Sequence, residues 1–264
     1  GPVQEIPLLR YQPGGDIPWH RVLYIKGPRG LIWNRDGLDQ LVPDQQNPIS
    51  WPLSLLVWNL CAGKHGMPWQ GRLPAISKRL EADVIALIEV GDEVVQHLLS
   101  GPYRYHHQEM LVALKHPPQQ VDHLNLSPGK DAMLFHYPQL QLAVAHFTSN
   151  FRASNEELRE RQWQALSSRL KAPWVVLGDL NASDHEISRW ECQDLTPPQP
   201  SFPSKNKRYQ RILASPELDG HSYTEKVGLS DHDPLYAQLH KPERNHQNAL
   251  VILPPHHQPI QDIR

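Results

Sequence analysis

The sequence predicts an α/β fold, and three observations support this prediction. Short apolar runs without polar alternation recur along the chain, as expected for strands that are covered on both faces. Segments with apolar residues at helical spacing lie between these runs, and several of the predicted strands end in a polar residue. With 264 residues, the chain is long enough for one large domain with an ordinary core.

The predicted domain opens with a strand, a helix and a second strand. Residues 53–58 form a buried strand that ends at Asn59, and the strand of residues 84–88 ends at Glu89. Residues 73–80, between the two strands, are apolar at helical spacing. Each of the two strands therefore presents a polar side chain at its end.

The next part of the chain is predicted to consist mainly of strands. We expect a short helix over residues 91–100 and several alternating strands over residues 110–145. The clearest of these strands is residues 140–146, which ends in His146. Residues 116–130 are predicted to be a loop.

A capped helix precedes the most informative strand. Residues 154–170 begin with an S-x-x-E capping box and have apolar residues at helical spacing. The buried strand of residues 174–177 follows, and Gly178 allows a sharp turn after it. Asp179 and Asn181 therefore lie in a firmly anchored loop.

A second loop of similar construction follows later in the chain. Residues 229–235 read L-S-D-H-D-P-L and place Asp231 and His232 before the alternating run of residues 236–239. Two acid-bearing loops that border apolar strands are interpreted as the halves of one site. The alternative for Asp179 and Asn181 is an ordinary Asp/Asn turn.

The sequence divides into three parts. Residues 1–50 contain proline-rich coil with candidate strands at residues 21–25 and 30–33, and we expect them to pack as an N-terminal extension on the main domain. Residues 51–240 form the predicted main domain. Residues 241–264 are rich in Pro and His and are predicted to be a poorly ordered tail.

Composition excludes several classes of protein. The net charge of −2 and the pI near 6.8 argue against a protein that coats nucleic acid through bulk charge. Only Cys61 and Cys192 are present, so a disulfide framework is excluded and a reducing compartment is favoured. No apolar run reaches the roughly 20 residues of a membrane helix, and we expect a cytoplasmic monomer. Gly1-Pro2 resembles a protease-cleavage scar, so the alternative that a signal peptide was removed stays open.

The polar residues at the strand ends are suited to one kind of chemistry. They are Asn59, Glu89, His146, the pair Asp179 and Asn181, and the pair Asp231 and His232. Carboxylate and amide oxygens suit a hard cation such as Mg²⁺. The sequence has no cluster of Cys and His residues, which argues against a zinc site. Histidines beside such a cation can bind phosphate or donate a proton, which favours phosphoester hydrolysis.

Single residues of this set also have structural interpretations. Glu89 could be an exposed glutamate at a strand end, and Asn59 could be a turn former. His146 could be a core histidine bonded to a backbone carbonyl.

Five motifs in a fixed order carry a family resemblance. They are V-W-N at 57–59, D-V-I-A-L-I-E-V at 83–90, A-V-A-H-F at 143–147, V-V-L-G-D-L-N at 175–181 and L-S-D-H-D-P-L at 229–235. Over about residues 53–240 the chain resembles the endonuclease/exonuclease/phosphatase superfamily, the DNase I-like metal-dependent phosphoesterases. The resemblance implies a four-layer sandwich, in which two mixed β-sheets pack face to face and helices flank them.

The resemblance also implies roles for the residues at the strand ends. Glu89 would be the principal Mg²⁺ ligand, helped by Asn59 and Asp231, and Mn²⁺ would be a substitute. Asp179 would orient or deprotonate the attacking water. The other three residues, Asn181, His146 and His232, would bind the scissile phosphate and stabilise charge on its oxygens.

Two positions depart from the family pattern. Cys61 stands where many of the nucleases have an acid, which weakens one auxiliary metal contact. In residues 208–213, Gln210 replaces the acid of the family motif. The resemblance implies that Gln210 contacts the ring of His232 in place of that acid.

The substrate is inferred from basic and aromatic residues. The basic residues are Arg152, Lys205, Lys207, Arg208 and Arg211. Together with Phe202 and Tyr209 they could hold a nucleic-acid backbone and stack a base, which favours a nucleic-acid phosphodiesterase. The alternatives are a solvated basic loop, a phosphatase or phosphodiesterase for inositol phosphates, phospholipids or nucleotides, and a weakly catalytic nucleic-acid-binding module.

Overall fold

The computed structural model describes residues 24–27, 30–34, 49–61, 69–91, 103–150, 152 and 154–240. The helices are α1 (Trp69–Ser77), α3 (Asn155–Ser167), α4 (Asp184–Ile187) and the 3₁₀ helix η3 (Pro203–Lys205). The strands are β1 (Tyr24–Gly27), β2 (Gly30–Asn34), β3 (Leu53–Asn59), β4 (Val84–Ile88), β5 (Tyr103–His107), β6 (Met110–Leu114), β7 (Gln120–Ser127), β8 (Lys130–His136), β9 (Gln141–His146), β10 (Trp174–Asp179), β11 (Gln193–Asp194), β12 (Gln210–Ala214), β13 (Asp219–Thr224) and β14 (Leu235–His240).

Two six-stranded sheets form the body of the described structure. Sheet I has the strand order β13-β14-β3-β4-β6-β5, and sheet II has the order β11-β12-β10-β9-β8-β7. In sheet I only β3 and β4 run parallel, and in sheet II only β9 and β10 do. Both sheets are therefore mixed, as predicted. Strands β1 and β2 pair antiparallel with each other in a small sheet of their own.

The alternation of side chains in the strands builds the layers. In β3, Leu55 and Val57 belong to the central core between the sheets, whereas Leu56 and Trp58 face the opposite way. The outward residues of β3 pack with Ile76 of α1. Every residue of β4, β9 and β10 is buried, which explains the continuous apolar runs in the sequence.

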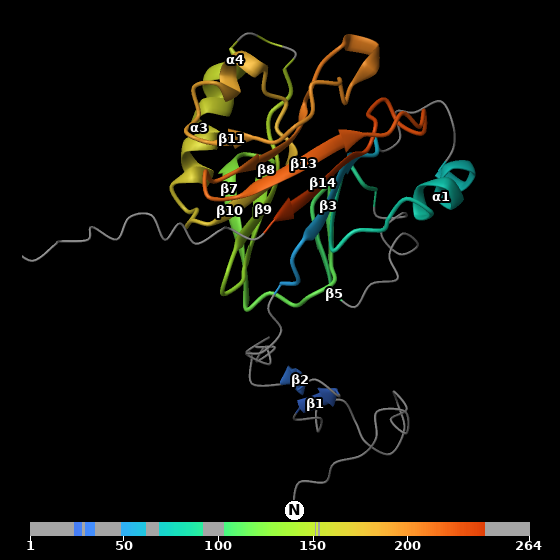
Figure 1. Ribbon diagram of the computed structural model, residues 1–264, viewed down its shortest axis with the longest axis vertical. Helices are drawn as coiled ribbons and strands as arrows, with labels where there is room; N and C mark the ends of the chain where they lie inside the picture. Colours follow the sequence, from blue (N-terminus) through green and yellow to red (C-terminus); the bar gives the residue numbers. More distant parts are fainter. Residues whose placement is uncertain are drawn as a thin grey trace, which may run out of the picture.

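Helices cover both outer faces. Trp163 and Leu166 of α3 pack with Val176 and Leu213 on the outer face of sheet II. Figure 1 shows α3 and α4 on one side of the sheets and α1 on the other. The four-layer sandwich that the sequence predicted is confirmed.

Several details differ from the predictions or lie outside the described residues. The side chain of Ser154 makes no capping hydrogen bond, so the predicted capping box does not form, and α3 ends at Ser167. Asp179 is the last residue of β10 and is not in a loop.

Residues 116–130 are not a loop throughout, because β7 occupies residues 120–127 and pairs with β8. This strand was missed because it lies at the edge of sheet II and most of its polar side chains are exposed or half-buried. Helix α1 begins at Trp69 and ends at Ser77, earlier than predicted. The predicted helix at residues 91–100 and the tail fall almost wholly outside the described residues.

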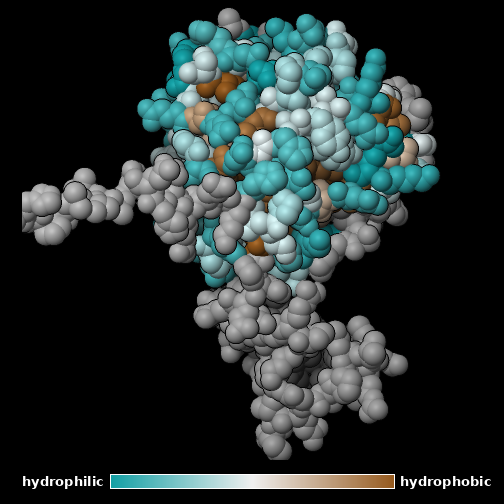
Figure 2. Space-filling view, in the orientation of Figure 1, coloured by the Kyte–Doolittle hydropathy of each residue, from teal (hydrophilic) through white to brown (hydrophobic). Residues whose placement is uncertain are grey.

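The described surface is mainly polar. Figure 2 shows hydrophilic side chains over most of the face in view, with hydrophobic residues in small separate spots. Among the described residues, Tyr223 is the large hydrophobic side chain that is exposed. None of the helices in this part of the chain is both long and apolar enough to cross a membrane.

Candidate active site

The parallel strand pairs bring the predicted residues to one end of the sandwich. In sheet I, Asn59 is paired with Ile88, so Glu89 follows directly beside it. In sheet II, the last residues of β9 and β10, His146 and Asp179, are paired. Since the sheets pack face to face, the carboxyl ends of all four strands meet.

The side chain of Asn59 joins the two sheets at this end. Its amide Nδ2 donates to Glu89 Oε1 at 3.0 Å and to Asp179 Oδ2 at 2.8 Å. Its Oδ1 accepts the backbone N–H of Cys61 at 2.9 Å. Asn59 is 1% exposed and Asp179 2% exposed, so this arrangement is firmly held.

Glu89, His146 and Asp179 form a group that fits a divalent cation. One ligand atom from each of them lies within 4.8 Å of the others. Two carboxylates held this close repel each other, and a bound cation would remove that repulsion. Carboxylate oxygens are the ligands that both Mg²⁺ and Mn²⁺ prefer. The donor chemistry of these residues therefore fits the predicted cofactor.

The backbone around this group adopts uncommon conformations. Glu89, Cys61 and Asn181 are non-glycine residues in the left-handed region, with φ angles of 54°, 53° and 51°. Such conformations often occur at functional sites, where the surrounding structure enforces them. Gly178 has a φ of 157°, and a Cβ atom there would lie 1.9 Å from the carbonyl oxygen of Ala145. Only glycine allows β10 to approach β9 this closely just before Asp179.

His146 is surrounded by charged side chains. Its Nε2 lies 3.9 Å from Glu89 Oε1, and its Nδ1 lies 3.6 Å from Glu109 Oε2. Lys130 Nζ lies 3.3 Å and 3.4 Å from the two ring nitrogens. His146 is therefore part of the charged cluster at the strand ends and not a core histidine bonded to a backbone carbonyl.

Asn181 lies directly beside Asp179. Its backbone N–H donates to Asp179 Oδ1 at 3.1 Å, and its Nδ2 donates to the carbonyl of Phe147 at 3.2 Å. The first bond holds the carboxylate of Asp179 in place, and the second holds the Asn181 side chain against the end of β9.

The loop before β14 reaches the same end of the sandwich. The hydroxyl of Ser230 donates to the carbonyl of Asn59 at 2.8 Å, and Trp58 Nε1 donates to the carbonyl of His232 at 2.9 Å. His232 Nε2 then lies 3.7 Å from Asp179 Oδ2. Asp231 is exposed, and its Oδ1 accepts a bond from the Ser230 hydroxyl at 3.3 Å. This loop thus adds an imidazole to the cluster and a carboxylate beside it.

The predicted contact between the side chain of Gln210 and the ring of His232 does not form, so this prediction was wrong. Gln210 Nε2 donates to the carbonyl of Asp233 at 2.6 Å, and its Oε1 accepts the backbone N–H of Asn59. Glutamine is one methylene longer than aspartate, so its amide reaches strand β3. Gln210 therefore fastens β12 to β3 and to the loop that carries His232.

The predicted basic residues fall into two groups. Arg152, Lys205 and Lys207 are exposed. In contrast, the guanidinium of Arg211 is 1% exposed and donates to Asp194, Asp184 and the carbonyl of Ala182.

Arg208 is held in a similar way. It donates to Asp184 and to the carbonyls of Thr196 and Pro197. Arg208 and Arg211 therefore stabilise the loops around Asp184, a placement that differs from the substrate-binding role expected from the sequence.

Burial and charge shift several pKa values near the site. Burial and the negative charge of Asp179 raise the pKa of Tyr209, so its hydroxyl stays protonated at neutral pH. Burial lowers the pKa of Arg72, which donates to the carbonyls of Leu60 and Leu229 and so ties α1 to the two loops. Hydrogen bonds from Arg211 and Arg208 outweigh burial and hold the pKa of Asp184 below its usual value.

Lys130 and Glu109 were not assigned to the site from the sequence, and Phe202 was expected to stack a base and not to contact His232. Lys130 follows a Pro-Gly turn in the segment that was predicted to be a loop, and Glu109 lies in the turn between β5 and β6. No local sequence pattern places either of them beside His146. Lys130 lies there because β8 pairs with β9 in sheet II, and Glu109 lies there because sheet I packs against sheet II.

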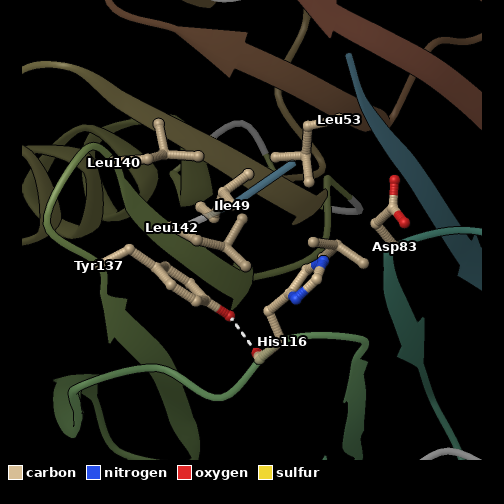
Figure 3. A pocket seen from close by; sticks show the side chains of 8 residues that line it. Ile49, Leu53, Asp83, His116, Tyr137, Leu140 and Leu142 are labelled. Carbon is tan, nitrogen blue, oxygen red and sulfur yellow. Dashed lines mark hydrogen bonds between the residues drawn. The ribbon is translucent and has the colours of Figure 1, made fainter. Parts of the chain in front are cut away.

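A hollow lies at the end of the sandwich opposite to this site, where β3, β4 and β9 begin. Its lining is largely apolar and includes Leu53, Leu140 and Leu142, and the hydroxyl of Tyr137 donates to the carbonyl of His116 there (Figure 3). Glu89, Asp179 and His232 do not line it. The chemistry-bearing residues therefore gather at the other end.

Solved structures of similar fold are known. A humanized D. rerio TDP2 with 14 mutations has a TM-score of 0.59 and 18% identity, over 71% of this chain and 98% of that chain. An endonuclease/exonuclease/phosphatase from Beutenbergia cavernae DSM 12333 has a TM-score of 0.58 and 17% identity, over 72% and 71% of the two chains. An endonuclease/exonuclease/phosphatase family protein from Bacteroides thetaiotaomicron has a TM-score of 0.57 and 14% identity, over 71% and 97%. At these identities the likeness is one of fold. No curated protein matches the chain at a significant level.

Two packed mixed sheets with carboxylates and histidines at one end define the class of DNase I-like phosphoesterases. Residues 56–232, more than half of the chain, match the model of the Endonuclease/Exonuclease/phosphatase family, and the chain belongs to this family. Membership supports a hydrolase that acts on phosphoester bonds.

Proposed function

We propose that the protein is a Mg²⁺-dependent phosphodiesterase that acts on nucleic acid, with Mn²⁺ as a substitute for Mg²⁺. The observation that carries this proposal is the bridge that Asn59 makes between the carboxylates of Glu89 and Asp179, with His146 and His232 beside them. Such a site combines ligands for a hard cation with hydrogen-bond donors for phosphate oxygens.

Glu89 is the proposed principal metal ligand. Asn59 holds its carboxylate at 3.0 Å, the ring of His146 lies 3.9 Å from the same oxygen, and Asp231 is an additional acid on the neighbouring loop. A divalent cation bound there would neutralise charge on the phosphate oxygens. Removing the cation should therefore stop turnover.

Asp179 is the proposed base for the attacking water. Its Oδ1 accepts the backbone N–H of Asn181 at 3.1 Å, and its Oδ2 accepts the amide of Asn59. These two bonds fix the carboxylate, so it can take the proton of a water molecule in a defined direction. His146, His232 and the Asn181 side chain would donate to the phosphate oxygens, where negative charge increases during the reaction.

A nucleic-acid substrate is supported by the exposed cations. Arg152, Lys205 and Lys207 are exposed, and Lys205 is the last residue of η3, three residues after Phe202. Exposed cations of this kind can hold a phosphate backbone. A phospholipid substrate is less well supported, since the face in Figure 2 has no extended apolar area among the described residues.

The test is a substrate panel with the purified full chain in Mg²⁺, in Mn²⁺ and in EDTA. The panel contains single-stranded, duplex and abasic DNA, RNA, phosphoinositides, sphingomyelin and a nucleotide. We expect hydrolysis of a nucleic acid that requires the cation and stops in EDTA. Turnover of a lipid or an inositol phosphate alone would overturn the substrate assignment. Nucleic-acid binding without turnover would favour the binding module, which is suggested by Cys61 and Gln210, two positions where the family pattern has an acid.

A further inference from the structure

The main chain on both sides of the His232 ring is firmly held. The N–H of His232 donates to the Ser230 hydroxyl at 3.3 Å, and its carbonyl accepts from Trp58 Nε1 at 2.9 Å. The following residue, Asp233, donates its N–H to the carbonyl of Ser201 at 2.8 Å. These bonds fix the position of the residue, but they leave the rotation of the imidazole about its side-chain bonds undetermined.

Hydrogen bonding does not set that rotation. His232 Nδ1 is buried, and no described residue forms a hydrogen bond with it. The side chain of Gln210 is occupied at both of its polar ends, by Asn59 and by Asp233. A buried imidazole usually has one nitrogen held by a carboxylate or a carbonyl, and such a bond fixes its orientation. Something else must hold the ring of His232.

Phe202 is packed directly against this ring. The two ring centroids are 4.6 Å apart, and the planes are tilted by 31°. Phe202 is 8% exposed, and its backbone is held in a short bridge, because its N–H donates to the carbonyl of Lys207 at 2.8 Å. The bond from Asp233 to Ser201 joins the two loops directly beside the rings. The aromatic contact is therefore anchored from both sides.

We propose that Phe202 is a positioning residue for His232. Its ring forms a wall that keeps the imidazole in the rotamer in which Nε2 faces Asp179, 3.7 Å from Oδ2. Aromatic packing thus takes over the orienting task of a hydrogen-bonded partner. The catalytic consequence rests on the proposed function, whereas the orientation itself can be tested without any turnover.

The first test observes the ring of His232 by NMR in the full chain. Proton–carbon correlation spectra of the histidine rings are assigned by comparison with His232→Ala. Phe202→Leu should change the NOEs between the His232 ring protons and the β-protons of the same residue, which report the rotation of the ring, and Phe202→Tyr should retain them. The matched control is Phe135→Leu, which changes a fully buried phenylalanine of the central core and should leave these NOEs unchanged. Unchanged NOEs of the His232 ring in Phe202→Leu would overturn the proposal.

The second test measures turnover of the substrate that the panel identifies. Phe202→Leu should lower kcat by roughly 10- to 100-fold with KM unchanged, because a small misplacement of a catalytic group has an effect of this size. Phe202→Tyr should retain most of the activity. In the His232→Ala background, Phe202→Leu should have no further effect on kcat, since the two residues act as one unit.

Each outcome separates the two proposals. An equal fall in kcat with and without His232 would show that Phe202 acts only on stability, and would overturn its positioning role. If the native protein hydrolyses nothing in the panel, the proposed function fails. The NMR comparison then still decides whether Phe202 orients the ring.

Discussion

A carboxamide between two carboxylates is the main feature of the site at the scale of single residues. Asn59 satisfies one oxygen of Glu89 and one of Asp179, and its own oxygen is fixed by Cys61 N–H. From the sequence, Asn59 was expected to be a direct metal ligand. Its bonds in the structure support a different contribution, in which it keeps the two carboxylates at the spacing that a cation requires.

We therefore expect Asn59→Leu to weaken Mn²⁺ binding about 10- to 100-fold, the usual effect of losing an orienting partner of a ligand. The measurement is calorimetric titration of the full chain with Mn²⁺. Gln164→Leu, which removes an exposed carboxamide on α3, is the control and should bind Mn²⁺ normally. Equal affinity in the Asn59 variant would show that this amide does not organise the carboxylates.

At the scale of secondary-structure elements, a buried ion pair joins α3 to α4. Arg159 Nε donates to Glu186 Oε1 at 2.7 Å, and both side chains are at most 3% exposed. Glu186 also accepts the N–H and the hydroxyl of Ser183 in a capping box. Burial alone would raise the pKa of Glu186, but the bonds from Arg159 and Ser183 lower it below the usual value.

This shift predicts a pH-dependent contribution to stability. Because the pKa of Glu186 is lower in the folded than in the unfolded state, its contribution is present above the unfolded-state pKa and is lost as the pH falls through the folded-state pKa. At pH 7, Glu186→Gln should lower the free energy of unfolding by about 3 kcal/mol or more, since it leaves Arg159 without its buried partner. In strong acid the difference from the native protein should shrink.

Urea unfolding at pH 7 and in acid measures both effects. The control is Glu156→Gln, which removes the exposed pair of Glu156 with Arg189 and should change stability by less than about 1 kcal/mol. A difference between Glu186→Gln and the native protein that stays constant with pH would contradict this account.

Gly178 gives a prediction about the β9–β10 pair. A Cβ at this position would overlap the carbonyl oxygen of Ala145, and the φ of 157° disfavours other residues. We expect Gly178→Ala to lower the free energy of unfolding by about 3 kcal/mol or more. Gly91→Ala is the control, because a Cβ there meets no atom within 4 Å. Thermal unfolding compares the two, and equal melting temperatures would show that β9 and β10 can separate without loss.

The elements also show which features a sequence can predict. The strands that carry Asn59, Glu89 and Asp179 were predicted because they are buried on both faces and end abruptly in a polar residue. Strand β7 was missed because an edge strand with exposed polar residues lacks that pattern. The predicted contact between Gln210 and His232 was wrong because the contacts of Gln210 depend on the distance between β12 and β3. No local sequence pattern contains that distance.

At the scale of the whole molecule, binding of the proposed nucleic-acid substrate has to depend on local charge. The net charge is −2, so a polyanion is attracted by a few exposed cations and not by the overall field. Lys205 and Lys207 are exposed, and both lie beside Phe202, whose ring packs against His232. In contrast, Arg208 and Arg211 form ion pairs with Asp184.

Replacing both lysines by glutamine should weaken nucleic-acid binding and flatten its salt dependence. The magnitude of the slope of log K against log salt concentration should fall by up to about 2, because fewer counterions are released when two phosphate contacts are missing. Lys115→Gln with Lys171→Gln is the matched control, since both lysines are exposed and lie toward the opposite end of the sandwich. Fluorescence anisotropy at several salt concentrations measures the slope, and an unchanged slope would place the substrate elsewhere.

The central claim is that Glu89 and Asp179 carry out cation-dependent hydrolysis at the joint end of the two sheets. Its most direct test is the Mg²⁺-supported rate of Glu89→Gln and Asp179→Asn, with the exposed Glu217→Gln as the control for loss of a carboxylate. Both substitutions keep the size of the side chain and remove its charge, so the melting temperatures should stay close to that of the native protein. We predict that each lowers kcat by at least about 100-fold, while Glu217→Gln retains the native rate. A near-native rate in Mg²⁺ for either of the two site variants would contradict the account.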